Sequence, residues 1–347
     1  MPAVVITGTL SSVPSFFWQT VKINQLRYIC EVERRQLNVS AAAEALHTSQ
    51  PGVSKQIRLL EDELGIEIFE RSGKQLIRIT PAGRDILAMA RQVLDTVGSI
   101  RSIAADHADN QRGSLAIATT QTQALHALPD VVQHFRLGYP HVQLHIHQGT
   151  PLQIAEQAAS GVVDFAIATE ALELFSDLVV LPCYQWNRCV VVPTGHPLCE
   201  APLSLEAIAE YPLVTYVFGF TGRSRLDDAF ASAGLDPQVS LTATDAEVIK
   251  TYVRLGLGVG IIASMAVNQD RDRDLVTLDA SHLFKPSTTS VAFRSSLRLR
   301  GYACDFITTF APHLTRDVLY DAADLSGTPD WDAFNQALQH LLPGAPR

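Results

Sequence analysis

The 347-residue sequence contains few cysteines, no long hydrophobic run and no charged side chain among its first twenty residues. The five cysteines include no CxxC pair, which argues against a zinc ribbon or a disulfide framework and for a reducing compartment. No apolar run reaches the roughly 18 residues of a membrane span, so we expect no membrane association. Residues 1–20 lack the basic start of a secretory signal, and Pro14 interrupts their apolar run. We therefore expect a cytoplasmic protein in which residues 1–21 are an extension, with Val21 as an alternative start of translation.

Catalytic motifs are also missing. There is no Gly-x-Ser-x-Gly elbow and no P-loop, and spacing gives no Ser/His/Asp set. The stretch Gly256–Gly260 follows a predicted helix and precedes a predicted strand, whereas a dinucleotide fingerprint requires the reverse order. His141, His145 and His147 share one strand region, but spacing suggests no further ligand. The sequence therefore predicts no enzyme, no cofactor and no metal site.

The net charge of −9 is distributed unevenly along the chain. Residues 21–112 contain 13 Lys and Arg against 12 Asp and Glu, whereas residues 113–347 contain 14 against 24. The acidic excess therefore lies in the C-terminal part. The N-terminal part can still expose a basic face, which keeps nucleic-acid binding open for it.

The N-terminal part has the pattern of a small helical domain. Asn24–Arg34 is predicted to be a helix, and Asn38–Gly65 a short helix, a turn and a longer helix that Ser49 can cap. Apolar residues recur at helical spacing on one side of the longer helix: Val53, Ile57, Leu60 and Leu64. Short polar and basic residues lie on the opposite side: Pro51, Ser54, Lys55 and Arg58. This is typical of a helix-turn-helix, although a three-helix bundle with a solvated polar face fits about equally well.

Ile68–Thr80 contains two short β-prone runs around a Ser-Gly-Lys turn, which predicts a hairpin-like wing. The basic residues of this wing, Arg71, Lys74 and Arg78, could contact phosphates. The stretch AAAEALHTSQPGVSKQIRLLEDELGIEIFERSGKQLIRITPAG resembles the winged helix-turn-helix of LysR-type transcriptional regulators. The resemblance implies binding to double-stranded promoter DNA. It implies DNA contacts from these residues: Ser49, Gln50, Pro51, Ser54, Lys55, Arg58, Arg71 and Lys74.

A long helix is predicted to start at Pro81, with Thr80 as its cap. It carries a heptad seam of apolar residues: Ile86, Ala90, Val93, Val97, Ile100 and Ala104. The seam favours a dimerising linker helix, because two recognition helices must lie about 34 Å apart to read a symmetric site. Packing of the helix on its own domain is the alternative. The polar stretch Asp106–Gly113 predicts an inter-domain linker.

From Gly113 onward strands and helices alternate, as in an open α/β sheet whose ligands bind at the carboxyl ends of strands. The stretch IATTQTQA, residues 117–124, places three threonines and two glutamines at one such joint. Further threonines follow other strands. Capping boxes at Thr120–Gln123, Thr150–Gln153 and Thr244–Glu247 explain part of this pattern. The remaining hydroxyls predict a neutral cage of donors for a small oxyanion, sulfate or a carboxylate.

The C-terminal part resembles the CysB/Cbl subfamily of LysR-type regulators in stretches such as GSLAIATTQTQALHALP, LVVLPCYQWNRCVVVP and YPLVTYVFGFTGRSRLDDAF. The resemblance implies a two-lobed, periplasmic-binding-protein-like α/β effector domain. Its cleft would bind N-acetylserine, O-acetylserine, sulfate or thiosulfate. The residues carried over into that cleft are Thr120, Thr122, Gln123, Thr169 and Thr221, with Gln121 and Glu170 beside them. Gln121 stands where histidine is expected in the enterobacterial proteins.

The resemblance also implies a function. The protein would regulate cysteine-biosynthesis and sulfur-assimilation genes, mainly as an activator, with RNA polymerase as a partner and a homodimer or homotetramer as its assembly. A Cbl-like regulator of organosulfur or sulfonate use is the alternative. A solute-binding protein is a weaker one, because it leaves the helix-turn-helix unused. The predicted division of the chain is a winged helix-turn-helix at 22–80, a linker helix and hinge at 81–112, one effector lobe at 113–181 and 289–312, a second lobe at 182–288, and a tail at 313–347.

Overall fold

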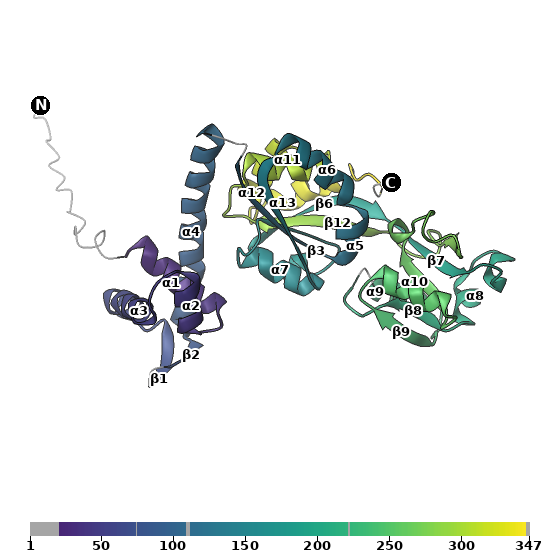
Figure 1. The fold of residues 1–347 in the computed structure, drawn as a ribbon, viewed down its shortest axis with the longest axis horizontal. Helices are drawn as coiled ribbons and strands as arrows, with labels where there is room; N and C mark the ends of the chain where they lie inside the picture. Colours follow the sequence, from purple (N-terminus) through teal and green to yellow (C-terminus); the bar gives the residue numbers. More distant parts are fainter. Residues whose placement is uncertain (1–20, 74, 109–111, 221–222, 345–347) are drawn as a thin grey trace, which may run out of the picture. The chain divides into compact units, whose positions relative to one another are not determined.

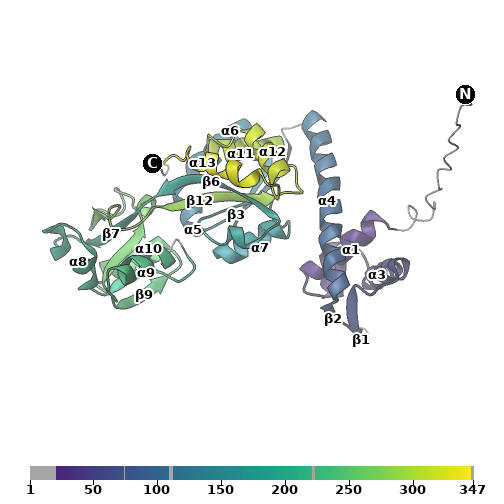
Figure 2. The same ribbon diagram turned by 180° about the vertical axis from the view of Figure 1, so that it is seen from behind.

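The computed structural model describes residues 21–73, 75–108, 112–220 and 223–344, without the side chains of 105–108. The chain divides into two compact units, residues 1–98 and 99–347, and their boundary lies within helix α4 (Pro81–Ala108). Figure 1 and Figure 2 show the helices and strands from opposite sides. None of the described helices has the length and apolar character needed to cross a membrane.

The N-terminal unit is a three-helix domain with a wing. Its elements are α1 (Ile23–Arg34), α2 (Val39–Ala45), α3 (Gln50–Leu64), β1 (Phe69–Ser72), β2 (Gln75–Ile79) and the start of α4. Local chemistry sets the helix ends: Asn38 Oδ1 accepts from Ala41 N at 3.0 Å, and Ser49 Oγ accepts from Gly52 N at 3.2 Å. Gly65, at φ 69°, ends α3 in the left-handed conformation that glycine adopts freely. The helix-turn-helix and the antiparallel wing are present as predicted.

The seam of α4 divides into two parts. Ile86 and Ala90 pack into the hydrophobic core of the N-terminal unit. Val93 is 41% exposed and Ile100 is 62% exposed, so neither apolar side chain is buried by the described part of the chain. Packing on the helix's own domain therefore explains the first turns of the seam, and the later turns leave an apolar face uncovered.

The second unit contains two five-stranded sheets. In the first, which we call lobe I, the strand order is β4-β3-β5-β12-β6. Its strands are β3 (Arg112–Thr119), β4 (His141–Gln148), β5 (Phe165–Ala168), β6 (Leu178–Trp186) and β12 (Ser287–Arg294). Helix α7 (Pro151–Ala159) covers one face, and α6 (Pro129–Gly138) and α11 (Gly301–Phe310) cover the other (Figure 1). β3 is parallel to β4 and β5, and β12 runs antiparallel to β5 and β6.

The second sheet, lobe II, has the strand order β11-β7-β10-β8-β9. Its strands are β7 (Arg188–Pro193), β8 (Leu213–Tyr216), β9 (Val239–Ala243), β10 (Val259–Ala263) and β11 (Leu275–Asp279). The helices of this lobe are α8 (Leu205–Ala209), α9 (Arg223–Ser232) and α10 (Ala246–Arg254). The chain crosses between the lobes from β6 to β7 and from β11 to β12. These two sheets, which follow a winged helix-turn-helix in the chain, confirm the predicted α/β class.

The C-terminal tail belongs to lobe I. Helices α12 (Arg316–Leu325) and α13 (Trp331–Gln339) place Leu319, Ala322 and Leu338 in the core of that lobe. The chain then reaches the edge strand β6, where Gln185 N donates to Pro343 O at 3.0 Å. The tail therefore completes the hydrophobic core and covers a sheet edge.

Candidate DNA-binding surface and effector site

Helix α3 presents the predicted DNA-contacting residues at the surface. Gln50, Pro51, Lys55 and Arg58 are exposed, and Ser54 is half-buried. The apolar face of α3 is buried in the domain core through Val53, Ile57 and Leu60. Amphipathic packing therefore fixes which face of α3 remains available to a major groove. Gln50 Nε2 donates to Ser54 Oγ at 3.1 Å, a bond that holds the Gln50 amide along the helix.

The wing arginines have partners within the domain. Glu61 is buried and accepts from Ile68 N at 3.0 Å and from Phe69 N at 3.1 Å, and it forms a short ion pair with Arg71. Arg71 is only 22% exposed, so its guanidinium ties the wing to α3. Its contact with phosphate stays a prediction. Arg78 is exposed and pairs with Glu70 at 2.6 Å, and that hydrogen bond raises the pKa of Arg78. Lys74 lies outside the described residues.

The polar joint at the start of α5 (Gln121–His126) is not the predicted capping box. Thr120 is the N-cap residue, yet among the described residues its hydroxyl makes no capping bond to the helix. Gln123 turns inward instead: its Nε2 donates to Thr289 Oγ1 at 3.1 Å, and its Oε1 accepts a short bond from Tyr184. Burial decides this outcome, because an inward amide must satisfy its polar atoms inside the lobe.

The other two predicted capping boxes have opposite outcomes. At α7, Thr150 Oγ1 accepts from Gln153 N at 3.2 Å and Gln153 Oε1 accepts from Thr150 N at 3.0 Å, which confirms the box. The capping box predicted at α10, with Thr244 as its first residue, is wrong. Asp245 caps this helix by accepting from Glu247 N at 2.7 Å, and a carboxylate at this position also suits the helix dipole.

Thr289 is the centre of the buried polar cluster in lobe I. Its hydroxyl accepts from Gln123 Nε2 and from Trp186 Nε1, each at 3.1 Å, and lies 3.5 Å from Thr169 Oγ1. The antiparallel register of β12 with β6 produces this convergence by placing Thr289 opposite Tyr184. The predicted residues Gln123 and Thr169 therefore do come together.

Thr122 links the cluster to lobe II. Its side chain is buried beside Tyr216, the last residue of β8; burial raises the pKa of the Tyr216 phenol, and Thr122 acts in the opposite direction. Thr119 instead donates to Ile167 O at 3.0 Å inside lobe I. The remaining predicted residues that the structure describes, Thr120, Gln121 and Glu170, are half-buried, and Thr221 lies outside the described residues.

The surroundings of this site are not wholly neutral, contrary to the prediction of a neutral cage. Arg188 is buried at the first crossing between the lobes, and its NH2 donates to Ser287 Oγ at 3.2 Å. Burial, with the nearby charge of Arg225, lowers the pKa of Arg188 to about 10, and Glu170 acts in the opposite direction. Burial likewise raises the pKa of the Tyr184 phenol, so this hydroxyl stays protonated as a donor.

Sequence reasoning missed Thr289, Tyr184, Trp186, Tyr216 and Arg188. A signal was present for one of them, since the hydroxyl-rich run Ser287–Ser290 (STTS) opens a strand that is otherwise apolar. The aromatic residues gave none, because buried tyrosine and tryptophan are ordinary core residues. In the part of the chain that the structure describes, no three histidine, cysteine or acidic side chains are arranged to hold a metal ion.

A winged helix-turn-helix followed by a two-lobed domain with a polar junction defines a DNA-binding regulator that responds to a small molecule. Comparison with known proteins agrees. The family described as bacterial regulatory helix-turn-helix protein, lysR family, matches residues 23–84, and the LysR substrate binding domain matches residues 108–315. The chain belongs to the LysR family of bacterial transcriptional regulators, and its relatives are regulators rather than enzymes.

The matches to individual relatives cover nearly the whole length of those relatives. The HTH-type transcriptional regulator CysB of Haemophilus influenzae is 57% identical over 306 residues, which are 88% of this chain and 94% of the relative. The HTH-type transcriptional regulator SsuR of Burkholderia cenocepacia is 48% identical over 295 residues, 85% of this chain and 96% of the relative. The crystal structure of the cofactor-binding domain of the Cbl transcriptional regulator is 40% identical, with a TM-score of 0.60 over 62% of this chain and 95% of that one.

Proposed function

We propose that this regulator controls cysteine-biosynthesis and sulfur-assimilation genes, mainly as an activator, in response to a small effector bound at the lobe junction. The observation that carries the proposal is the convergence of Gln123 and Thr169 on the buried hydrogen-bonding cluster of lobe I, with Thr122 of the same helix beside Tyr216 of lobe II. Hydroxyl and amide donors beside the Arg188 cation suit an oxyanion. The effectors are N-acetylserine, O-acetylserine, sulfate or thiosulfate. The 57% identity to CysB supports the gene class.

The effector is tested by thermal shift of the full-length protein against these four compounds, with chloride as the salt control. A ligand that binds only the folded state stabilises it by about 2.7 kcal/mol at a hundredfold excess over Kd. Thr122→Ala should weaken the binding of the active compound at least fivefold, since it loses about one buried hydrogen bond. Thr277→Ala, an exposed threonine on β11, is the matched control. Equal binding by both variants would remove Thr122 from the site.

The alternative is regulation of organosulfur or sulfonate genes, which the 48% identity to SsuR supports. Titration of the full-length protein onto promoter fragments from both gene classes separates the two. Tighter binding to a sulfonate-utilisation promoter, with a response to sulfate but not to acetylserines, would favour the alternative.

DNA contact by α3 is tested separately. Lys55→Ala should abolish specific promoter binding at physiological salt, while effector binding is unchanged. Arg35→Ala, which removes an exposed arginine paired with Glu31 at 2.9 Å, is the matched control. Full DNA affinity of Lys55→Ala would exclude α3 as the recognition helix.

We further propose that the protein works in the cytoplasm as a homodimer or homotetramer and contacts RNA polymerase at the promoter. The uncovered apolar residues Val93 and Ile100 on α4 support a second copy of the chain as the partner of that helix. Val93→Asp should lower the molecular mass measured by analytical ultracentrifugation, and an unchanged mass would refute this interface.

A further inference from the structure

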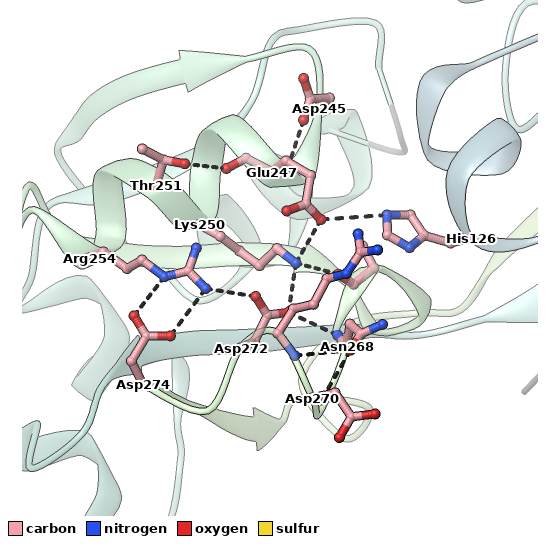
Figure 3. Close-up of polar contacts among 12 residues, drawn as sticks. His126, Asp245, Glu247, Lys250, Thr251, Arg254, Asn268, Asp270, Asp272 and Asp274 are labelled. Atoms are coloured by element: carbon pink, nitrogen blue, oxygen red, sulfur yellow. Dashed lines mark hydrogen bonds and ion pairs between the residues drawn. The ribbon is translucent and has the colours of Figure 1, made fainter.

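Helix α5 touches lobe II at a second place, away from the effector cluster. His126, the last residue of α5, has its Nε2 3.9 Å from Glu247 Oε1 on α10, across the lobe junction (Figure 3). This distance is too long for a direct hydrogen bond, so the imidazole and the carboxylate meet as neighbouring polar groups across the junction. The helix that holds Thr122 and Gln123 therefore also carries a side chain that faces the other lobe.

Glu247 is held in place by a buried network in lobe II (Figure 3). Lys250 Nζ lies 2.8 Å from Glu247 Oε1 and 2.7 Å from Asp272 Oδ2, and it donates to Ala266 O at 2.9 Å. The Lys250 side chain is 1% exposed, so its ammonium depends on these three acceptors. Arg254 NH2 adds a 2.7 Å contact to Asp272. The Glu247 side chain is 46% exposed, and its carboxylate is oriented by an ammonium that buried partners hold in place.

The same network is connected back to the effector cluster. The short 3-10 helix η4 (Ser264–Ala266) packs on α5, and its Met265 Sδ lies 3.9 Å from Tyr184 Oη, the hydroxyl that bonds Gln123. Ala266, the residue after Met265, provides the carbonyl oxygen to which Lys250 Nζ donates. The contacts therefore form a ring that leaves and re-enters α5 in this order: Gln123, Tyr184, Met265, Ala266, Lys250, Glu247 and His126.

We propose that this ring fixes the position of lobe II relative to α5, with His126 and Glu247 as the positioning pair that regulates the effector site. The regulatory part rests on the proposed function. A ligand that contacts Thr122 or Gln123 acts on the N-terminal turn of α5, and His126 lies at the opposite end of the same six-residue helix. A helix this short moves as one body, so displacement at the cluster is transmitted to the contact with Glu247. Occupancy of the cluster and lobe position are then coupled in both directions.

The protonation of His126 provides an independent test of the lobe arrangement. The charged groups that act on the pKa of His126 are Glu247 and Asp272, which raise it, and Lys250 and Arg271, which lower it. Burial is the largest effect and lowers the pKa of His126 below its ordinary value. A histidine whose pKa is lowered in one arrangement stabilises that arrangement while neutral and weakens it once protonated. The lobe arrangement should therefore loosen as pH falls from 7.5 to 5.5, and only when His126 is present.

The test measures lobe position without requiring a ligand. Nitroxide labels are attached to Cys199, which is exposed in lobe II, and to His134→Cys, an exposed site on α6 of lobe I, in a Cys30→Ser background of the full chain. Electron–electron resonance gives the interlobe distance distribution. His126→Ala and Glu247→Gln should each shift or broaden it, and the double variant should resemble either single one. Glu210→Gln, at an exposed site in lobe II, is the control and should leave it unchanged.

Two results would overturn the proposal. One is an interlobe distance distribution that is unchanged in both Glu247→Gln and His126→Ala. The other is a double variant whose change equals the sum of the changes in the two single variants. His126→Gln should abolish the pH dependence between 7.5 and 5.5, and a response that persists excludes His126 as its source. Binding of sulfate and of N-acetylserine is measured as well, and Glu247→Gln should bind these effectors three- to tenfold more weakly than wild type. If wild type binds neither probe while the distances shift as expected, the ring stands and the effector assignment fails.

Discussion

The buried pair of Lys250 and Asp272 should be the most consequential polar contact in lobe II. Asp272 accepts from Lys250 Nζ at 2.7 Å, from Arg254 NH2 at 2.7 Å and from Asn268 N at 2.9 Å (Figure 3). Removing one member of a buried ion pair typically costs about 3–5 kcal/mol, because the other charge stays desolvated. Since Lys250 keeps Glu247 as a partner, we expect Asp272→Asn to lose about 3 kcal/mol of unfolding free energy, at the lower end of that range.

The assay is urea unfolding of the full chain, monitored by circular dichroism and by tryptophan fluorescence. The free energies of unfolding of the variants are compared for the transition that both probes report. Asp274→Asn is the matched control, because Asp274 pairs with the same Arg254 but its side chain is 59% exposed. The control should show a much smaller loss. A loss for Asp272→Asn no larger than that of the control would refute the reasoning that the buried ammonium depends on this carboxylate.

The same pair has a defined pH dependence. Burial raises the pKa of Asp272, but hydrogen bonds from Lys250, Asn268 and Arg254 outweigh it and leave the pKa below its ordinary value. A carboxylate whose folded-state pKa is lowered contributes its stability above its unfolded pKa, about 3.9, and loses it as the pH falls through the folded value. The difference between wild type and Asp272→Asn should therefore be constant from pH 5 to 7 and shrink below about pH 4.

Three further substitutions test the buried contacts elsewhere. Glu61→Gln, which removes the buried carboxylate facing Arg71, should cost about 2 kcal/mol and speed amide exchange at the start of β1. Thr289→Val removes the acceptor of Trp186 Nε1 and should cost about 1–3 kcal/mol, with a shift in Trp186 emission; unchanged melting would contradict the role of this hydroxyl. Gly83→Ala would place a Cβ 2.2 Å from the carbonyl oxygen just before β1, and should cost about 1–3 kcal/mol in urea unfolding.

The local elements of the N-terminal unit could be predicted because their causes lie within a few residues. Ser49 caps the helix that begins one residue later, Gly65 ends it, and the 3.6-residue spacing of Val53, Ile57 and Leu60 selects its buried face. The wing followed from a turn between two β-prone runs. The role of Arg71 could not be read in this way, because its partner Glu61 lies ten residues earlier on another element.

The candidate effector site shows the same limit more clearly. The sequence placed threonines and glutamines at strand ends, and capping rules suggested local partners for them. Gln123 instead bonds Tyr184, 61 residues away, and Thr289, 166 residues away. Strand register between β6 and β12 creates that environment, and no local pattern encodes register between strands so distant in sequence.

The sequence by itself therefore determined the two-part organisation, the helix-turn-helix and the α/β class. Tertiary structure decided which side chains meet there. It assigned the α10 cap to Asp245 rather than to the preceding threonine, and it brought Glu247 toward His126 and Lys250. The physical reason is that helix periodicity and caps act over three or four residues, whereas a buried polar atom takes whichever partner the packing of two lobes brings within hydrogen-bond distance.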